Sequence, residues 1–141
     1  TPQGMWTVTM SRGNIDPTFD ACKLVEAAGA SFVARETMLD PKKLERTLVK
    51  AFEHKGFSFV EVFSNCHVNL GRKNKMATAM ANLEWIDSIS MGKAKFEKLE
   101  PEEQKGIFPT GILKQDTEAL EYCEAYDKVK EAHKNKTMVQ L

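Results

Sequence analysis

The feature that most constrains the fold is a short apolar run at residues 57–63. Only Ser58 and Glu61 interrupt it, as expected for a β-strand that is covered on both faces of a sheet. A second β-prone run lies at residues 31–35, and an amphipathic segment at 41–55 separates the two runs. Parallel neighbouring strands need a crossover of this kind, so the sequence predicts a βαβ unit and an α/β fold with a parallel sheet.

The same signals mark the helices around this unit. An Asp-Pro pair at positions 16–17 and another at 40–41 each supply a capping side chain and a preset φ for the first helical turn. Gly29 and Gly56 can take the left-handed conformation that ends a helix. The apolar face of the first predicted helix is formed by Phe19, Cys22 and Val25, with Leu24 as a further candidate. That of the second is formed by Leu44, Leu48, Ala51 and Phe52.

The carboxyl-terminal half carries weaker signals. A third helix is predicted before Gly92, residues 93–115 are predicted to be an irregular connector, and Asp116 is a candidate cap for a last helix. One βαβ unit is too narrow for most α/β domains, which have about four to six strands. We therefore expect further strands from elsewhere, or a partner that covers the exposed edge. The apolar residues assigned to these two helices are Met76, Met80, Leu83 and Trp85 or Ile86, and then Leu120, Cys123, Tyr126 and Val129.

Bulk composition excludes several classes of protein. Twenty basic residues balance twenty acidic ones, so no global field would attract nucleic acid or an anionic membrane surface. The apolar stretches are far shorter than the roughly 18 to 20 residues that cross a bilayer, and the amino end has no signal-peptide pattern. Three widely spaced cysteines form neither a disulfide framework nor a CxxC metal site. We expect a cytoplasmic protein without nucleic-acid or membrane partners.

The segment with the strongest candidates for a catalytic or metal-binding role is residues 64–72, which contains Cys66 and His67. It leaves the carboxyl end of a buried strand, where open α/β sheets place their sites. A thiolate at Cys66 could act as a nucleophile or as a soft metal ligand, and His67 could lower the pKa of that thiol or ligate beside it. The plain alternative is a partly buried loop cysteine. Phosphate-binding glycine loops, HExxH and GxSxG motifs do not occur.

Several segments in order resemble the beta subunits of 2-oxoacid:ferredoxin oxidoreductases, with the 2-oxoglutarate type favoured. The match is carried by His54-Lys55-Gly56-Phe57-Ser58-Phe59-Val60-Glu61-Val62, then Ser64, Cys66 and Gly71-Arg72-Lys73-Asn74-Lys75. Upstream it continues in residues 13–17, 28–30 and 32–35, and Thr1-Pro2-x-Gly4 resembles the end of the family's glycine-rich segment. The resemblance is strong over residues 1–75 and loose beyond them.

The resemblance implies a partial thiamine-diphosphate-binding fold with a parallel sheet and a C-terminal helical extension. Residues 1–91 would form the C-terminal half of the thiamine-diphosphate-binding domain, and residues 92–141 an extension made of a connector and a helix. The intact enzyme would oxidatively decarboxylate a 2-oxoacid, transfer the acyl group to coenzyme A and pass single electrons to ferredoxin or flavodoxin. Its partners would be the other subunits, and its cofactors thiamine diphosphate, Mg²⁺ and a [4Fe-4S] cluster.

The resemblance implies site roles for two residues. Cys66 matches the fourth cluster-ligating cysteine of the family, although His67 stands where proline commonly follows. Thr1 would lie near the cofactor, because the family's Thr-Pro segment follows its diphosphate-binding glycines. The Mg²⁺ motif and the other three cluster cysteines of the family lie upstream of these segments, so we expect this chain alone to bind no cofactor, to contain no catalytic residue and to be inactive.

A different class of protein remains as the alternative. A free-standing α/β interaction or assembly module would form a closed monomer without large exposed apolar patches. The remaining features have ordinary explanations. The basic turn Arg72–Lys75 is typical of a solvated surface, and the alternative is that it engages a phosphate of coenzyme A or the acidic surface of a ferredoxin. Cys22 and Cys123 are expected to pack as small apolar side chains. The opening Thr1-Pro2-Gln3-Gly4 lacks an initiator methionine and a cap, which is typical of a piece of a longer chain.

Overall fold

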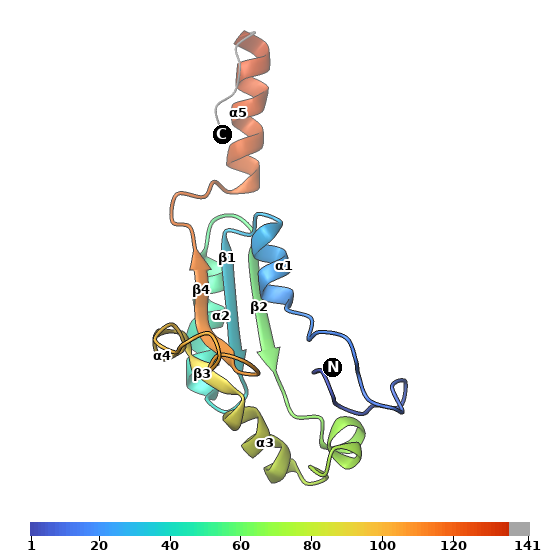
Figure 1. Ribbon diagram of the computed structural model, residues 1–141. Helices are drawn as coiled ribbons and strands as arrows, with labels where there is room; N and C mark the ends of the chain where they lie inside the picture. Colours follow the sequence, from blue (N-terminus) through green and yellow to red (C-terminus); the bar gives the residue numbers. More distant parts are fainter. Residues whose placement is uncertain (136–141) are drawn as a thin grey trace.

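A four-stranded sheet with the strand order β2-β1-β4-β3 forms the centre of the computed structural model, which describes residues 1–135 (Figure 1). The strands are β1 (Phe32–Thr37), β2 (Ser58–Phe63), β3 (Ser90–Gly92) and β4 (Phe108–Gln115). Around and beyond them lie α1 (Ala21–Ala27), α2 (Pro41–Glu53), a short π-helical turn (His67–Gly71), α3 (Ala79–Ser88), α4 (Lys93–Phe96) and α5 (Tyr122–Asn135).

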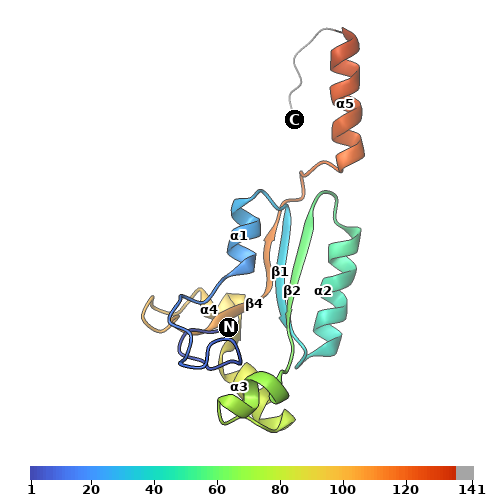
Figure 2. The same cartoon turned by 90° about the vertical axis from the view of Figure 1, so that its right-hand side faces the viewer.

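The predicted βαβ unit is confirmed. β1 and β2 pair in parallel, from Phe32 opposite Ser58 to Thr37 opposite Phe63, and α2 connects them. α1 and α2 lie on opposite faces of the sheet (Figure 2), so every residue of β1 is buried. β2 is instead an edge strand whose residues are only partly covered, and the expectation of a strand buried on both faces was wrong for it.

The irregular connector predicted for residues 93–115 is wrong, because this segment forms α4 and β4. β4 runs antiparallel to β1, so the sheet is mixed, and only the β1–β2 and β3–β4 pairs are parallel. The strand was not predicted because it contains Pro109 and Gly111, residue types that are rare in strands. Pairing with β1 begins only at Gly111, so the missing amide of Pro109 breaks no hydrogen bond to β1, and Gly111 takes a φ of +113° that favours glycine.

The first helix also begins later than its sequence signals indicate. The Asp-Pro pair at 16–17 lies in a turn held by Asn14, whose Oδ1 accepts the Asp16 amide at 3.1 Å. α1 begins at Ala21, and Asp20 caps it by accepting the amide of Lys23 at 3.2 Å. Only part of the apolar face predicted for this helix is buried: Cys22 is buried, whereas Phe19 is 69% exposed.

The core is small and gathers on β1. Phe32, Val33 and Ala34 are fully buried, and Cys22 and Ala30 pack with Val33. α5 projects away from the sheet, and Glu124 near its start pairs with Lys55 at 2.9 Å (Figure 1). No helix among residues 1–135 is long and apolar enough to cross a membrane. The boundary predicted between residues 91 and 92 falls inside β3, which pairs with β4 in the same sheet.

Candidate functional site

The loop that carries Cys66 leaves the carboxyl end of β2, at the end of the sheet where the amino-terminal loop also lies (Figure 1). The Cys66 side chain is exposed, while its backbone is firmly held. Its N–H donates to Oδ1 of Asn82 on α3 at 2.8 Å, and its carbonyl accepts the Gly71 amide at 2.9 Å. The thiol is therefore presented to the outside from a fixed backbone, as a ligand for an external group requires.

Gly71 is the residue on which this loop closes. Besides donating to Cys66, it accepts the amides of Asn74 and Met76 at 3.1 and 2.8 Å through its carbonyl. A Cβ at Gly71 would lie 2.1 Å from the carbonyl oxygen of Met76, a backbone atom. Only glycine permits this approach, so the path of the chain from Cys66 to Met76 depends on it.

Asn74 joins the Cys66 loop to the amino-terminal loop. Its Oδ1 accepts the amide of Trp6 at 2.9 Å, and its Nδ2 donates to the carbonyls of Trp6 and Leu70 at 2.9 and 2.7 Å. The two segments that the sequence singled out, around Thr1 and around Cys66, therefore lie on neighbouring loops.

Thr1 belongs to the same amino-terminal loop through Asn14. The buried Asn14 side chain donates to the Thr1 carbonyl at 2.8 Å, and its backbone pairs with Gly4 and Met5. The Thr1 side chain is exposed. Within residues 1–135 no hydrogen bond links Thr1 directly to Cys66, so the structure brings their loops together rather than the two side chains.

The other polar residues near Cys66 do not form a catalytic pair with it. Asn65 contacts Nδ1 of His67 at 3.4 Å through its side-chain amide, and no hydrogen bond in the described part of the chain joins His67 to the Cys66 thiol. Arg72, Lys73 and Lys75 are exposed, and none of them forms an ion pair within the described residues. Their sequence interpretation as a solvated basic turn fits this arrangement.

A buried ionic cluster lies on the α1 face of the sheet. Arg35 of β1 is 1% exposed, and its guanidinium binds Asp20 and, at 2.6 Å, Oε2 of Glu61. Burial opposes the charge of Arg35, but the hydrogen bond to Glu61 and the surrounding anionic groups raise its pKa above the ordinary value. Phe63 and Phe108 flank the guanidinium at 5.9 and 5.5 Å.

Cys22 borders this cluster, and Asp20, Cys22 and Glu61 are the only group in residues 1–135 with the spacing of metal ligands. Arg35 already occupies the carboxylates, so the cluster fits an internal ion pair and not a metal site. The predicted core packing of Cys22 is confirmed. Burial, together with Glu61, raises the pKa of its thiol from 9.0 to about 12.

The Cys22 thiol should make the protein lose stability in alkali. Between pH 9 and about 12 the thiol is ionised in the unfolded chain but protonated in the folded one. The unfolded state then binds fewer protons, so the free energy of unfolding falls as pH rises through this range. Denaturant titrations of the native protein and Cys22→Ala should show a steeper alkaline decline in the native protein. Parallel curves would contradict the raised pKa.

Cys123 departs from its predicted place. It is exposed at the start of α5, and Glu121, not Asp116, accepts the amides of the first turn. The side chains expected to form the apolar face of this helix meet no described core, and Tyr126 is 54% exposed. Met80 of α3 was also assigned to an apolar helix face, but it is 65% exposed. Asn82 and Ile86 are the buried residues of that helix.

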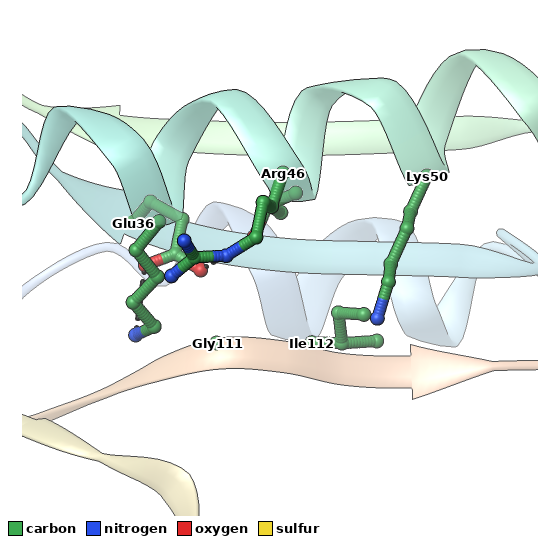
Figure 3. A pocket seen from close by; sticks show the side chains of 7 residues that line it. Glu36, Arg46, Lys50, Gly111 and Ile112 are labelled. Atoms are coloured by element: carbon green, nitrogen blue, oxygen red, sulfur yellow. Dashed lines mark hydrogen bonds and ion pairs between the residues drawn. The ribbon is translucent and has the colours of Figure 1, made fainter.

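A concave surface lies between α2 and β4 and has a volume of about 260 Å³. Thr47 donates to Glu36 at 2.7 Å at its inner wall, and Lys43 pairs with the same carboxylate at 2.9 Å. Lys50 extends from α2 towards Ile112 of β4 (Figure 3). The groove is basic, but the buried Glu36 already neutralises one of its cations, and it lies apart from the loops of Cys66 and Thr1.

Sequence reasoning missed two residues that shape the Cys66 loop, Gly71 and Asn82. Gly71 was noted only as part of a basic turn. Asn82 had a recognisable signal: it precedes Ile86 by four residues on a predicted helix, so a polar amide stands on the face that the helix buries. A buried amide at such a position needs a specific hydrogen-bond partner, and here that partner is the backbone of Cys66.

Comparison with known proteins gives consistent results. Residues 1–62 match the family described as thiamine pyrophosphate enzyme, C-terminal TPP binding domain. 2-Oxoglutarate synthase subunit KorB of Methanothermobacter thermautotrophicus is 37% identical over 110 residues, which cover 78% of this chain and 38% of that protein. KorB of Methanocaldococcus jannaschii is 34% identical over 135 residues, covering 96% of this chain and 50% of the relative. The chain thus spans half or less of the length of these relatives.

The fold has a counterpart among solved structures. The whole chain superposes on 48% of a chain in 2-oxoglutarate:ferredoxin oxidoreductase from Magnetococcus marinus, solved with 2-oxoglutarate, coenzyme A and succinyl-CoA bound, with a TM-score of 0.67. At 18% identity this likeness supports the fold alone.

Proposed function

We propose that this chain, which belongs to the thiamine pyrophosphate enzymes and is homologous to the KorB subunits, is part of the beta subunit of a 2-oxoglutarate:ferredoxin oxidoreductase. The assembled enzyme would release the carboxylate next to the keto group of 2-oxoglutarate as CO₂. It would transfer the remaining acyl group to the thiol of coenzyme A. The two electrons set free would pass one at a time to ferredoxin or flavodoxin. Its partners are accordingly the other subunits, the electron carrier, the 2-oxoacid and coenzyme A.

The observation that carries this proposal is the presentation of Cys66 beside the amino-terminal loop. Thiamine diphosphate supplies carbanion stabilisation when bound, and a [4Fe-4S] cluster supplies one-electron transfer. Cys66 fits a cluster ligand because its thiol is exposed while its backbone is fixed by Asn82 and Gly71. Thr1, on the neighbouring loop, would lie at the edge of the thiamine diphosphate site. This chain would contribute positioning residues and no catalytic ones.

The described residues do not fit Mg²⁺ or a complete cluster. Their one group with metal-ligand spacing is occupied by Arg35, and Cys66 stands apart from the other two cysteines. A cubane cluster normally takes four cysteine thiolates. The Mg²⁺ ligands and three further cysteines would therefore come from the remainder of the subunit, and we expect no cofactor binding by this chain alone.

The surface of the chain favours a component of a larger assembly over a free-standing module. Its accessible surface is 10148 Å² for 15.9 kDa. A compact monomer of this mass exposes roughly 7,400 Å². Large apolar side chains contribute to the excess, including Phe52 at 88% and Ile15 at 85% exposure. A cytoplasmic location is part of the proposal, because free, exposed Cys66 and Cys123 suit a reducing compartment.

Replacement of Cys66 tests the proposal. In the full-length subunit assembled with its partners, Cys66→Ala should abolish the electron paramagnetic resonance (EPR) signal of the reduced cluster, lower bound iron and stop 2-oxoglutarate-dependent reduction of ferredoxin, because one thiolate ligand is lost. Cys123→Ala makes the same change at another exposed cysteine and should leave iron content and activity unchanged. A Cys66→Ala enzyme with a full cluster would contradict the assignment.

A further inference from the structure

Asn82 holds a hydrogen-bond donor that nothing in the described chain accepts. Its side chain is 1% exposed, yet Nδ2 has no partner within residues 1–135. The orientation of the amide is fixed by its neighbour: Oδ1 accepts the Cys66 N–H, and a flipped amide would place two donors against each other. Native structures leave few buried donors unpaired, and each such group needs an explanation.

The position of Asn82 narrows what the missing acceptor can be. Nδ2 shares a carbon atom with Oδ1, which is 2.8 Å from the Cys66 nitrogen, so the free donor lies beside the backbone of the proposed ligand. Sulfur of a thiolate or sulfide accepts hydrogen bonds from amides, and such bonds are among the features that set the reduction potential of a cluster. Reduction adds negative charge, so the bond strengthens in the reduced state.

We propose that Asn82 is a positioning residue for the cluster: it orients Cys66 through Oδ1 and donates an Nδ2 hydrogen bond to a sulfide of the cluster. This inference rests on the proposed role of Cys66. The bond favours the reduced cluster and so eases the transfer of electrons into it. One side chain thus serves both the geometry and the electron affinity of the site.

Asn82→Asp separates the two parts of this role. The carboxylate keeps an oxygen for the Cys66 amide, so the loop remains anchored, but it removes the donor and adds negative charge. In the assembled enzyme, at a pH where the carboxylate is ionised, EPR-monitored titration should show the equilibrium constant for one-electron reduction of the cluster falling by about tenfold. Iron content should stay at the native level.

Asn69→Asp is the matched control. It makes the same chemical change three residues from Cys66, on the π-helical turn, but at an exposed side chain where solvent screens the charge. Its reduction equilibrium should stay within about twofold of the native value. An Asn82→Asp enzyme with a native potential and a full cluster would overturn the inference while leaving Cys66 as a ligand. A native subunit whose iron does not depend on Cys66 would overturn both proposals.

A measurement on the native enzyme decides the matter if Asn82→Asp does not fold. With asparagine labelled with ¹⁵N at the side-chain amide, pulsed EPR of the reduced cluster should show a ¹⁵N coupling. The coupling should persist in Asn65→Ser, which removes the asparagine amide that precedes Cys66 directly in the sequence, and in Asn69→Asp, which removes the amide on the π-helical turn. Absence of the coupling in the native enzyme, or its loss in Asn65→Ser, would exclude Asn82 as the donor.

Discussion

Replacement of Arg35 by methionine should lower the free energy of unfolding by about 3 kcal/mol. The guanidinium is buried and binds both Asp20 and Glu61. Its removal leaves two carboxylates close together, with side chains only 26% and 23% exposed, and neither has another cation as partner in the described chain. Because Asp20 also caps α1, the loss should loosen that helix as well. Denaturant unfolding followed by circular dichroism measures the effect.

Two further variants show whether the charge balance is the cause. Arg46→Met removes an exposed arginine from α2 and should change the free energy of unfolding by less than about 0.5 kcal/mol. A triple variant with Arg35→Met, Asp20→Asn and Glu61→Leu removes the whole network and keeps a capping side chain, so it should recover most of the lost stability. An Arg35→Met protein with native stability would show that the cluster is not structurally required.

Replacement of Gly71 by alanine should destroy the Cys66 site. The new methyl group would lie 2.1 Å from the Met76 carbonyl oxygen, and because this is a backbone atom no flexible side chain can move aside to relieve the clash. The turn must open, which breaks the hydrogen bond from Gly71 to Cys66 and releases the loop from its anchor. We expect the full-length subunit to lose most of its cluster and about 2 to 4 kcal/mol of stability.

Gly92→Ala is the control for this change. A Cβ at Gly92 meets nothing within 4 Å, so the same substitution should leave both iron content and unfolding unaltered. Iron analysis and denaturant titration of the two variants give the comparison. If Gly71→Ala retains the native cluster content, Cys66 does not depend on the closed turn.

The predictability of the fold differed between the two halves of the chain. The secondary structure of residues 31–63 could be predicted because each element carried its own local signal. Apolar runs indicated the two strands, and a capped amphipathic segment indicated the helix between them. β4 could not be predicted, because Pro109 and Gly111 locally disfavour a strand. Residues 108–115 form one only by pairing with the distant β1. Pairing with a strand that lies so far away in the sequence leaves no local pattern in residues 108–115.

The candidate site shows the same limit. Cys66 was identified because it follows a strand and stands in a recognisable family segment, and its role as a cluster ligand remains a proposal. Asn82 was not identified as its support, because the hydrogen bond between them spans sixteen residues and two elements. Cys123 was wrongly placed in a core, since helical periodicity shows that a face exists but not what covers it.

The sequence by itself determined the α/β class, the βαβ unit and the family, because these depend on local propensity and on residue identity along the chain. The tertiary structure alone decided that β2 is an edge strand, that β4 runs antiparallel beside β1, and that Arg35 balances two carboxylates in the interior. It also placed the loops of Thr1 and Cys66 side by side through Asn74. These features arise from contacts between distant segments, whose free energy exists only once the chain has folded.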